Sequence, residues 1–166
     1  MRQYKNEKNE EKHVLGIEKE LFTIATGEVI TLTDVNDPVF SQKMMGDGFA
    51  VIPATGEVTA PLSGKIVSVF PTKHAIGMQT AEGAEVLIHM GLDTVQMSQP
   101  AFEILVSEGQ EVVAGTTIAQ MNLDAIKNEG KETTIIVVFT DDKVNGLTIN
   151  KLGDTERGTV IGKINL

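Results

Sequence analysis

Short runs of β-branched and other apolar residues, each ended by a turn that contains Gly or Pro, recur along most of this chain. Val, Ile and Thr together account for 49 of the 166 residues. Such residues favour strands, because their branched side chains pack well on a pleated surface. The 16 Gly and 5 Pro divide the runs into segments of strand length. The chain is therefore predicted to be all-β, an antiparallel β-sandwich or flattened barrel with one short helix.

The predicted elements follow from apolar patterning and turn signals. Asn122 or Asp124 can cap the single helix, and Gly130 can end it. The strands are expected at residues 21–24, 28–32, 50–52, 57–60, 65–70, 85–90 and 133–140. The last two of these strands are rich in apolar residues and are predicted to be buried on both faces.

Two stretches of the chain resemble each other in pattern. Residues 26–32 (TGEVITL) and residues 63–69 (SGKIVSV) both read as hydroxyl residue, Gly, charge, two apolar residues, hydroxyl residue, apolar residue. The stretches begin 37 positions apart. This agreement favours an internal duplication of one strand-and-turn motif.

Residues 1–20 differ from the rest in composition. They hold five basic and five acidic residues, so the net charge of −9 lies entirely in residues 21–166. This polar stretch is interpreted as an N-terminal tail or linker, or as a short amphipathic helix that docks on a partner, and residues 21–166 as one domain.

The start lacks a signal-peptide pattern, and no apolar run approaches the about 20 residues of a spanning helix. We therefore expect a cytoplasmic protein with no direct membrane insertion.

Composition excludes several kinds of function. A net charge of −9 argues against nucleic acid as the main partner, because phosphate binding needs a basic surface. The chain has no Cys, which excludes a disulfide framework, a thiol nucleophile and any Cys-ligated metal site.

Two of the three histidines stand out by their context. His13 lies in the charged tail and is interpreted as incidental. His89 ends an apolar run, and strand alternation places it on the same face as Glu85 and Leu87. A lone His in such a place is more often structural. His74, however, lies 15 residues earlier, and a turn through residues 80–83 would pair the two segments and bring both imidazoles to one sheet face.

A pair of imidazoles suits phosphoryl chemistry. A neutral His nitrogen is a good nucleophile toward phosphorus, and a second imidazole can donate a hydrogen bond to the oxygens that gain charge. Zinc binding is the competing use, but a zinc site needs three or four protein ligands. Asp93 could be a third ligand, and no convincing fourth is present.

The segments around these histidines resemble a known family. Residues 71–77 (PTKHAIG) and 86–95 (VLIHMGLDTV) look like the two histidine motifs of the glucose-type enzyme IIA of the bacterial sugar phosphotransferase system. The similarity spans roughly residues 20–166 and includes residues 37–40 (DPVF), 46–48 (GDG), 58–64 (VTAPLSG) and 108–110 (EGQ).

The resemblance implies a fold and a reaction. The fold is an antiparallel β-sandwich with a duplicated hybrid motif. The reaction is transfer of a phosphoryl group from the phosphohistidine of the carrier protein HPr to a cysteine of a IIB domain, which phosphorylates sugar during transport. By motif position, His89 corresponds to the acceptor, through Nε2, and His74 to the assisting histidine. No cofactor and no intrinsic metal are implied, although both histidines could join a zinc site at a partner interface.

Further roles carry over by position. Thr72 matches the threonine that hydrogen-bonds the assisting histidine, and Gly91 matches the glycine whose carbonyl holds the acceptor ring through Nδ1–H. One departure concerns the family's frequent Phe soon after the assisting histidine, where this chain has Ile76 and Gly77. The apolar surface around the histidines is therefore expected to be less aromatic than in the family, which leaves the choice of partner open.

The resemblance also implies partner-binding residues. Asp37 and Asp93 match acidic residues that flank the site, and Phe40 and Phe70 match parts of the apolar surface around the histidines. Such an apolar surface would exclude water from a phosphohistidine. Phe40 and Phe70 could instead belong to the core.

Three other functions remain open on the sequence. The chain could be a regulator whose contacts with target proteins depend on phosphorylation at the same site, because a phosphate adds a charge of about −1.5 to −2. It could be a biotinyl or lipoyl carrier domain, with Lys43 as the modified residue, or a zinc peptidase on a related β-scaffold. The last two leave both histidine motifs unexplained.

Overall fold

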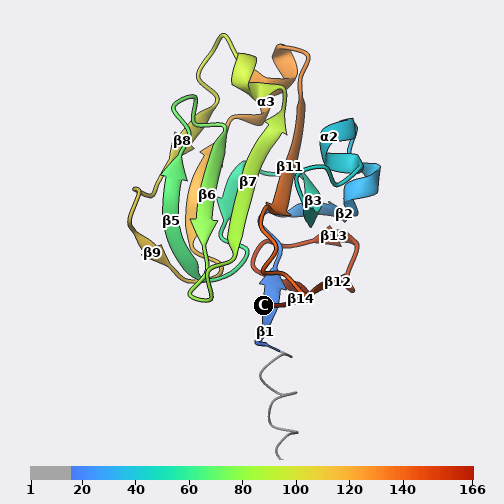
Figure 1. The fold of residues 1–166 in the computed structure, drawn as a ribbon. Coiled ribbons are helices and arrows are strands. Elements are labelled where there is room, and N and C mark those ends of the chain that lie inside the picture. Colours follow the sequence, from blue (N-terminus) through green and yellow to red (C-terminus); the bar gives the residue numbers. More distant parts are fainter. Residues whose placement is uncertain (1–15) are drawn as a thin grey trace, which may run out of the picture.

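A computed structural model describes residues 16–166 of the chain (Figure 1). The strands are β1 (Glu18–Phe22), β2 (Gly27–Ile30), β3 (Asp47–Pro53), β4 (Glu57–Thr59), β5 (Gly64–Val69), β6 (Ala75–Gln79), β7 (Glu85–Leu92), β8 (Phe102–Ile104), β9 (Glu111–Val112), β10 (Thr117–Met121), β11 (Glu132–Phe139), β12 (Gly146–Ile149), β13 (Gly153–Thr155) and β14 (Val160–Asn165). The helices are α2 (Pro38–Ser41), α3 (Leu123–Asn128) and the 3-10 helices Leu32–Asp34 and Thr94–Gln96.

The strands form one large and two small antiparallel sheets. The large sheet has eight strands in the order β13-β2-β3-β11-β7-β6-β5-β9, and the small sheets have the orders β4-β10-β8 and β1-β14-β12. The main core holds side chains from all three sheets, including Ile88 of β7, Ile118 of β10 and Ile164 of β14. The predicted all-β sandwich with few short helices is confirmed.

A second apolar cluster lies on the opposite face of the large sheet. It joins Phe40 of α2 to Ile136 and Val138 of β11 and to Leu92 at the end of β7. Strand β11 is therefore buried on both faces, as predicted, because Ile135 and Val137 point into the main core. The same prediction for β7 is wrong: Leu87 and His89 are only half-buried, because the second cluster covers the outer face of β7 incompletely.

Strands β6 and β7 form the hairpin that the sequence suggested. The turn between them is closed by the N–H of Thr80, which donates to the carbonyl of Ala84 at 2.9 Å. Ala75 lies opposite His89 in the antiparallel register, with Gly77 opposite Leu87. In Figure 1 these strands run side by side between β5 and β11.

The predicted helix and the predicted repeat both correspond to structure. Helix α3 begins after Asn122, whose side chain accepts a hydrogen bond from the N–H of Ala125 at 3.0 Å. The repeat stretches form β2 and β5, which start at Gly27 and Gly64. A Cβ at either Gly would lie within 2.7 Å of a carbonyl oxygen of the neighbouring strand, so both sites require close backbone approach.

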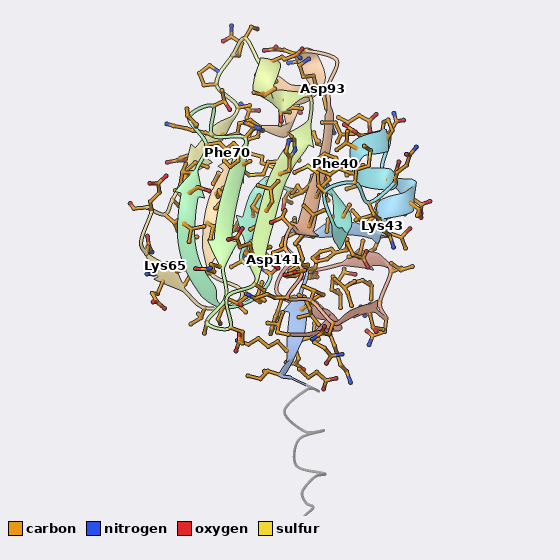
Figure 2. All side chains as sticks on the ribbon, viewed as in Figure 1. Phe40, Lys43, Lys65, Phe70, Asp93 and Asp141 are labelled. Atoms are coloured by element: carbon orange, nitrogen blue, oxygen red, sulfur yellow. The ribbon has the colours of Figure 1, made fainter. Side chains whose placement is uncertain are left out.

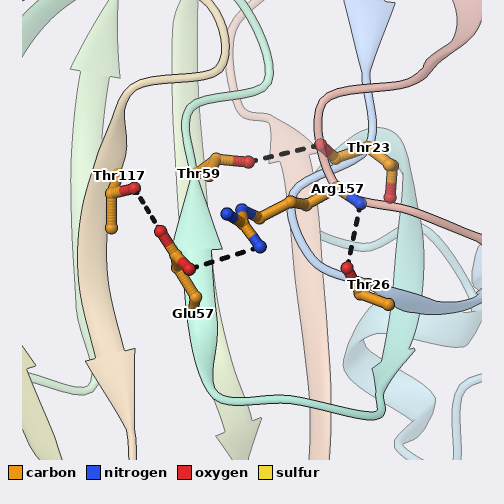
Figure 3. A network of polar contacts seen from close by, with 6 residues as sticks. All are labelled: Thr23, Thr26, Glu57, Thr59, Thr117 and Arg157. Atoms are coloured by element: carbon orange, nitrogen blue, oxygen red, sulfur yellow. Dashed lines mark hydrogen bonds and ion pairs between the residues drawn. The ribbon is translucent and has the colours of Figure 1, made fainter.

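Polar contacts tie the small sheets to the large one away from the histidines (Figure 3). The Glu57 carboxylate pairs with Arg157 at 3.3 Å and accepts from Thr117 Oγ1 at 2.6 Å. The N–H of Arg157 donates to Thr26 Oγ1 at 3.1 Å. These bonds join β4 and β10 to the segment between β13 and β14 and to the turn before β2.

The N-terminal strand starts earlier than the domain boundary that we expected at residue 21. Glu18 pairs with Asn165, and Leu21 is fully buried against the core. Most of the predicted tail, residues 1–15, lies outside the described residues. Among residues 16–166, no helix has the length and apolar character needed to cross a membrane.

Candidate active site

Backbone pairing places the two histidines next to each other. His89 lies on the outer face of β7, and His74 immediately precedes β6. The N–H of Met90 donates to the carbonyl of His74 at 2.7 Å, which fixes the approach of the two chain segments. The ring centroids are 5.0 Å apart, with the ring planes at 79°. The predicted convergence of His74 and His89 at one sheet face is confirmed.

The His89 ring is oriented by a backbone carbonyl. Its Nδ1 lies 2.8 Å from the carbonyl oxygen of Gly91. A carbonyl can only accept, so Nδ1 carries the hydrogen and Nε2 of the neutral ring keeps its lone pair. Gly91 has φ +84°, and a Cβ there would lie 2.4 Å from the side chain of Thr94. Only glycine fits this bend without displacing its neighbours.

The His74 ring is held by its own loop. Thr72 Oγ1 and His74 Nδ1 share a short hydrogen bond. The edge of the Phe70 ring also meets His74, with centroids 5.6 Å apart and planes at 82°. His74 is only 7% exposed. The structure therefore brings Thr72 and Phe70 to His74, as the sequence predicted.

Both imidazoles favour the neutral form. Burial lowers the pKa of His74 below its ordinary value of 6.5. Burial is also the main cause that lowers the pKa of His89, and repulsion by a charged His74 adds to it. The hydrogen bond to Gly91 and the charges of Asp37 and Asp93 oppose this shift only in part. A neutral His89 is the form that can act as a nucleophile.

Phe40 is a core residue, contrary to its expected place on the exposed apolar surface. It is 5% exposed and belongs to the second cluster. Its ring centroid lies 5.1 Å from that of His89, so the buried Phe40 ring packs against the His89 ring. The cause is α2, whose first turn begins with Pro38 and is capped by the Asp37 carboxylate, which accepts from the N–H of Val39 at 2.9 Å. This short helix turns Phe40 inward.

The remaining predicted residues flank the pair. Figure 2 shows Phe40, Phe70 and Asp93 around the upper end of β7. Asp93 follows β7 directly and has a left-handed backbone, with φ 59°. Phe70 is 37% exposed and, unlike Phe40, is available to a partner.

Sequence reasoning missed other exposed apolar residues near the site. Five of them stand on the segments that carry the flanking residues: α2 and the turn after it, β5, and the 3-10 helix after β7. We call Phe70 and these five the apolar rim; the five are Val39, Met44, Met45, Val67 and Val95. The sequence shows only that these residues lie close to the motif residues along the chain. Exposure could be recognised only from the structure.

The alternative sites receive no support from the described residues. Within residues 16–166, no three His, Asp or Glu side chains gather closely enough to hold a metal ion. Lys43, the carrier-lysine candidate, forms an ion pair with Asp47 at 3.3 Å. The described residues instead form a pair of imidazoles beside the apolar rim. Both rings favour the neutral form, and the lone pair of His89 is oriented by the bond to Gly91.

Comparison with known proteins points to one family. Residues 19–144 match the model of the family described as phosphoenolpyruvate-dependent sugar phosphotransferase system, EIIA 1. The chain is 46% identical over 155 residues to the PTS system glucose-specific EIICBA component of Streptococcus pneumoniae, covering 93% of this chain and 21% of that protein. It is 46% identical over 121 residues to the PTS system glucose-specific EIIA component of Staphylococcus aureus, covering 73% of each.

A solved structure agrees with these matches. Glucose permease IIA from Mycoplasma capricolum superposes with a TM-score of 0.83 at 38% sequence identity. The superposition covers 89% of this chain and 96% of the other. The chain thus spans nearly all of that IIA protein, but only about a fifth of the pneumococcal relative.

Proposed function

The chain belongs to the EIIA 1 family of the phosphoenolpyruvate-dependent sugar phosphotransferase system, and we propose that it carries a phosphoryl group on His89 Nε2 from HPr to a IIB domain. Membership makes it a phosphotransferase component of that system. The observation that carries the proposal is the His89 Nδ1–H bond to Gly91, with the His74 ring 5.0 Å away.

The first step is attack on the phosphohistidine of HPr. The lone pair of His89 Nε2 attacks phosphorus, a new N–P bond forms, and the N–P bond of the donor breaks with its electron pair returning to the HPr imidazole. In the second step a cysteine thiolate of the IIB domain attacks the same phosphorus, and the electron pair returns to Nε2. Phosphorylation and release therefore use the same open nitrogen.

His74 assists by donating a hydrogen bond to the phosphoryl oxygens. When the hydroxyl of Thr72 donates to Nδ1, the neutral His74 ring carries its hydrogen on Nε2. This hydrogen can then reach oxygens that gain charge in the transition state. Burial of His74 excludes water, which strengthens the interaction and protects the phosphohistidine from hydrolysis.

Docking uses the apolar rim and the acidic residues beside it. Phe70 contacts His74 directly and remains partly exposed, so a partner that covers it also closes the site. Asp37 and Asp93 lie close enough to His89 to affect its pKa. They favour a partner whose own active site is bordered by basic groups.

The names of the relatives support the choice of a glucose system. The pneumococcal relative is named as a glucose-specific EIICBA component and the staphylococcal one as a glucose-specific EIIA component. We propose that the domain that begins with β1 (Glu18–Phe22) is the EIIA domain of a glucose system and that transfer takes place in the cytoplasm.

The test is phosphotransfer with purified parts. Enzyme I, HPr and phosphoenolpyruvate carrying a labelled phosphoryl group are incubated with the wild-type chain, and label is then followed to a glucose-type IIB domain. His89→Ala should take up no label, whereas His13→Ala, the control at a histidine outside both motifs, should label as the wild type does. Full labelling of His89→Ala would overturn the assignment.

A further inference from the structure

A buried threonine closes the end of β7 next to the acceptor histidine. Thr94 is 1% exposed, and its Oγ1–H donates to the carbonyl of Met90 at 2.6 Å. Met90 lies between His89 and Gly91, and its N–H donates to the carbonyl of His74 at 2.7 Å. One residue of backbone thus links the side chain of Thr94 to both histidine segments.

The side chain of Thr94 also leaves no room for a side chain at Gly91. A Cβ at Gly91 would lie 2.4 Å from Thr94 Cγ2 and 3.0 Å from the carbonyl oxygen of Glu132 on β11. Gly91 is therefore enclosed by Thr94 and by the neighbouring strand, at a backbone φ of +84°. That conformation aims the Gly91 carbonyl back at His89 Nδ1.

We propose that Thr94 is a positioning residue that sets the tautomer of His89. Its hydroxyl fixes the carbonyl of Met90, in the peptide before Gly91, and so holds the carbonyl of Gly91 facing Nδ1. If the turn relaxes, that carbonyl swings away and the neutral ring can place its hydrogen on Nε2. A ring with hydrogen on Nε2 has no lone pair at the position that faces His74 and the partner.

The consequence for reactivity rests on the proposed function, but the effect on the ring does not. Groups that hold the second nitrogen of a metal-ligating imidazole matter about 10-fold to 100-fold in affinity or activity, and we expect an effect of the same order for an imidazole that reacts through its other nitrogen. Thr94 acts one step further out, through Gly91, so a loss of about 10-fold in phosphorylation rate is expected for removal of its hydroxyl.

A second buried threonine offers a matched control. Thr80 lies at the other end of β7, is 4% exposed, and accepts from the N–H of Ala84 through its Oγ1 at 3.1 Å. Thr80→Val removes another buried turn hydroxyl, one that accepts from a backbone N–H, far along the hairpin from His89. It reports what the loss of such a bond does to stability alone.

The experiment measures the ring nitrogens of His89 by long-range ¹H–¹⁵N NMR above pH 7.5. In the wild type and in Thr80→Val, Nδ1 should carry the hydrogen. In Thr94→Val a population with hydrogen on Nε2 should appear, and Thr94→Ser, which keeps the hydroxyl, should restore the wild-type pattern. Thr94→Ala is recorded as well, so that misfolding of the Val variant does not end the test.

Rates of phosphorylation by HPr are compared on the same samples. Thr94→Val and Thr94→Ala should be slower by about 10-fold, and Thr94→Ser should stay within about twofold of the wild type. An unchanged tautomer in both hydroxyl-free variants overturns the proposal, as does a Ser variant with the Val pattern. If the wild type itself accepts no phosphoryl group, the proposed function fails, whereas the tautomer result still decides the role of Thr94.

Discussion

At the residue scale, the reactivity of His89 is governed by what surrounds its two nitrogens. Gly91 occupies Nδ1 and leaves Nε2 with its lone pair. Burial lowers the pKa of the ring, which keeps that lone pair free near neutral pH. His74 lies across from it, and its Nδ1 is engaged by the hydroxyl of Thr72 and not by a backbone carbonyl. The two imidazoles thus differ through their partners.

Replacing His74 by Gln should separate the two steps of the proposed reaction. A Gln amide can donate a hydrogen bond to the phosphoryl oxygens, so His89 should still be labelled by HPr. It cannot carry a positive charge as the group leaves for a cysteine, and donation to the IIB domain should slow by about 10²-fold or more. Rapid-quench rates for each step measure this. Equal donation rates for variant and wild type would contradict the division of roles.

The lowered pKa values also predict how stability depends on pH. Both histidines titrate below 6.5 in the folded chain and near 6.5 in the unfolded chain. The unfolded chain therefore binds protons first, and the free energy of unfolding should fall as the pH falls from 7.5 through 6.5. Urea denaturation at pH 7.5, 6.5 and 5.5 measures this decline. A His74→Gln/His89→Gln double variant should lose most of it, and an equal decline in that variant would refute the cause.

At the element scale, α2 decides how His89 is supported. Four residues form no stable helix alone, so α2 depends on the Asp37 cap, on Pro38 and on the burial of Phe40. The cap and the ring contact lie only three residues apart. Any loosening of the cap therefore reaches the His89 ring through Phe40.

Two substitutions at Asp37 should distinguish its cap from its charge. Asp37→Asn keeps a side-chain acceptor for the N–H of Val39 but removes a charge that raises the pKa of His89, so that pKa should fall further with little loss of stability. Asp37→Ala also removes the cap and should cost about 1 kcal/mol. NMR titration of His89 and urea denaturation measure the two effects. A lower stability for Asn than for Ala would contradict this reading.

The elements also show where sequence reasoning succeeds. Local signals predicted the β6–β7 hairpin and α3, since a turn at residues 80–83 and a cap at Asn122 are coded by neighbours in the chain. The burial of Phe40, in contrast, is not determined by its neighbours in the chain. It depends on Ile136 and Val138, almost 100 residues away, which form the surface that Phe40 covers. The partial exposure of Leu87 on β7 has the same long-range origin.

At the scale of the whole molecule, one sheet carries the site and the core stiffens it. His89 lies on β7 and His74 lies just before β6, at the β6–β7 hairpin in the middle of the eight-stranded sheet, with the main core behind it. The chain has a net charge of −9. Against this acidic background the apolar rim is the exposed apolar surface on which we propose that the partners dock.

A charge placed in the rim should therefore slow both transfers. Because Phe70 is 37% exposed, Phe70→Asp should leave the fold intact, but it forces a partner to desolvate a carboxylate on docking. Loss of an aromatic group at the centre of an interface costs about 2 kcal/mol or more, which corresponds to a loss of roughly 30-fold in affinity. Phosphorylation by HPr and donation to IIB, both measured at low protein concentration, should fall by about that factor.

The matched control for Phe70→Asp is Val113→Asp. Val113 is 67% exposed and follows Val112, which pairs with Gly64 at the other end of β5 from Phe70. The same added charge there should leave both rates within about twofold of the wild type, because surface changes away from an interface cost little. A third variant, Phe70→Leu, keeps an apolar side chain and should lie between the wild type and Phe70→Asp. If Val113→Asp slows transfer as much as Phe70→Asp does, net charge and not the rim governs docking; if neither does, the partners approach by another face.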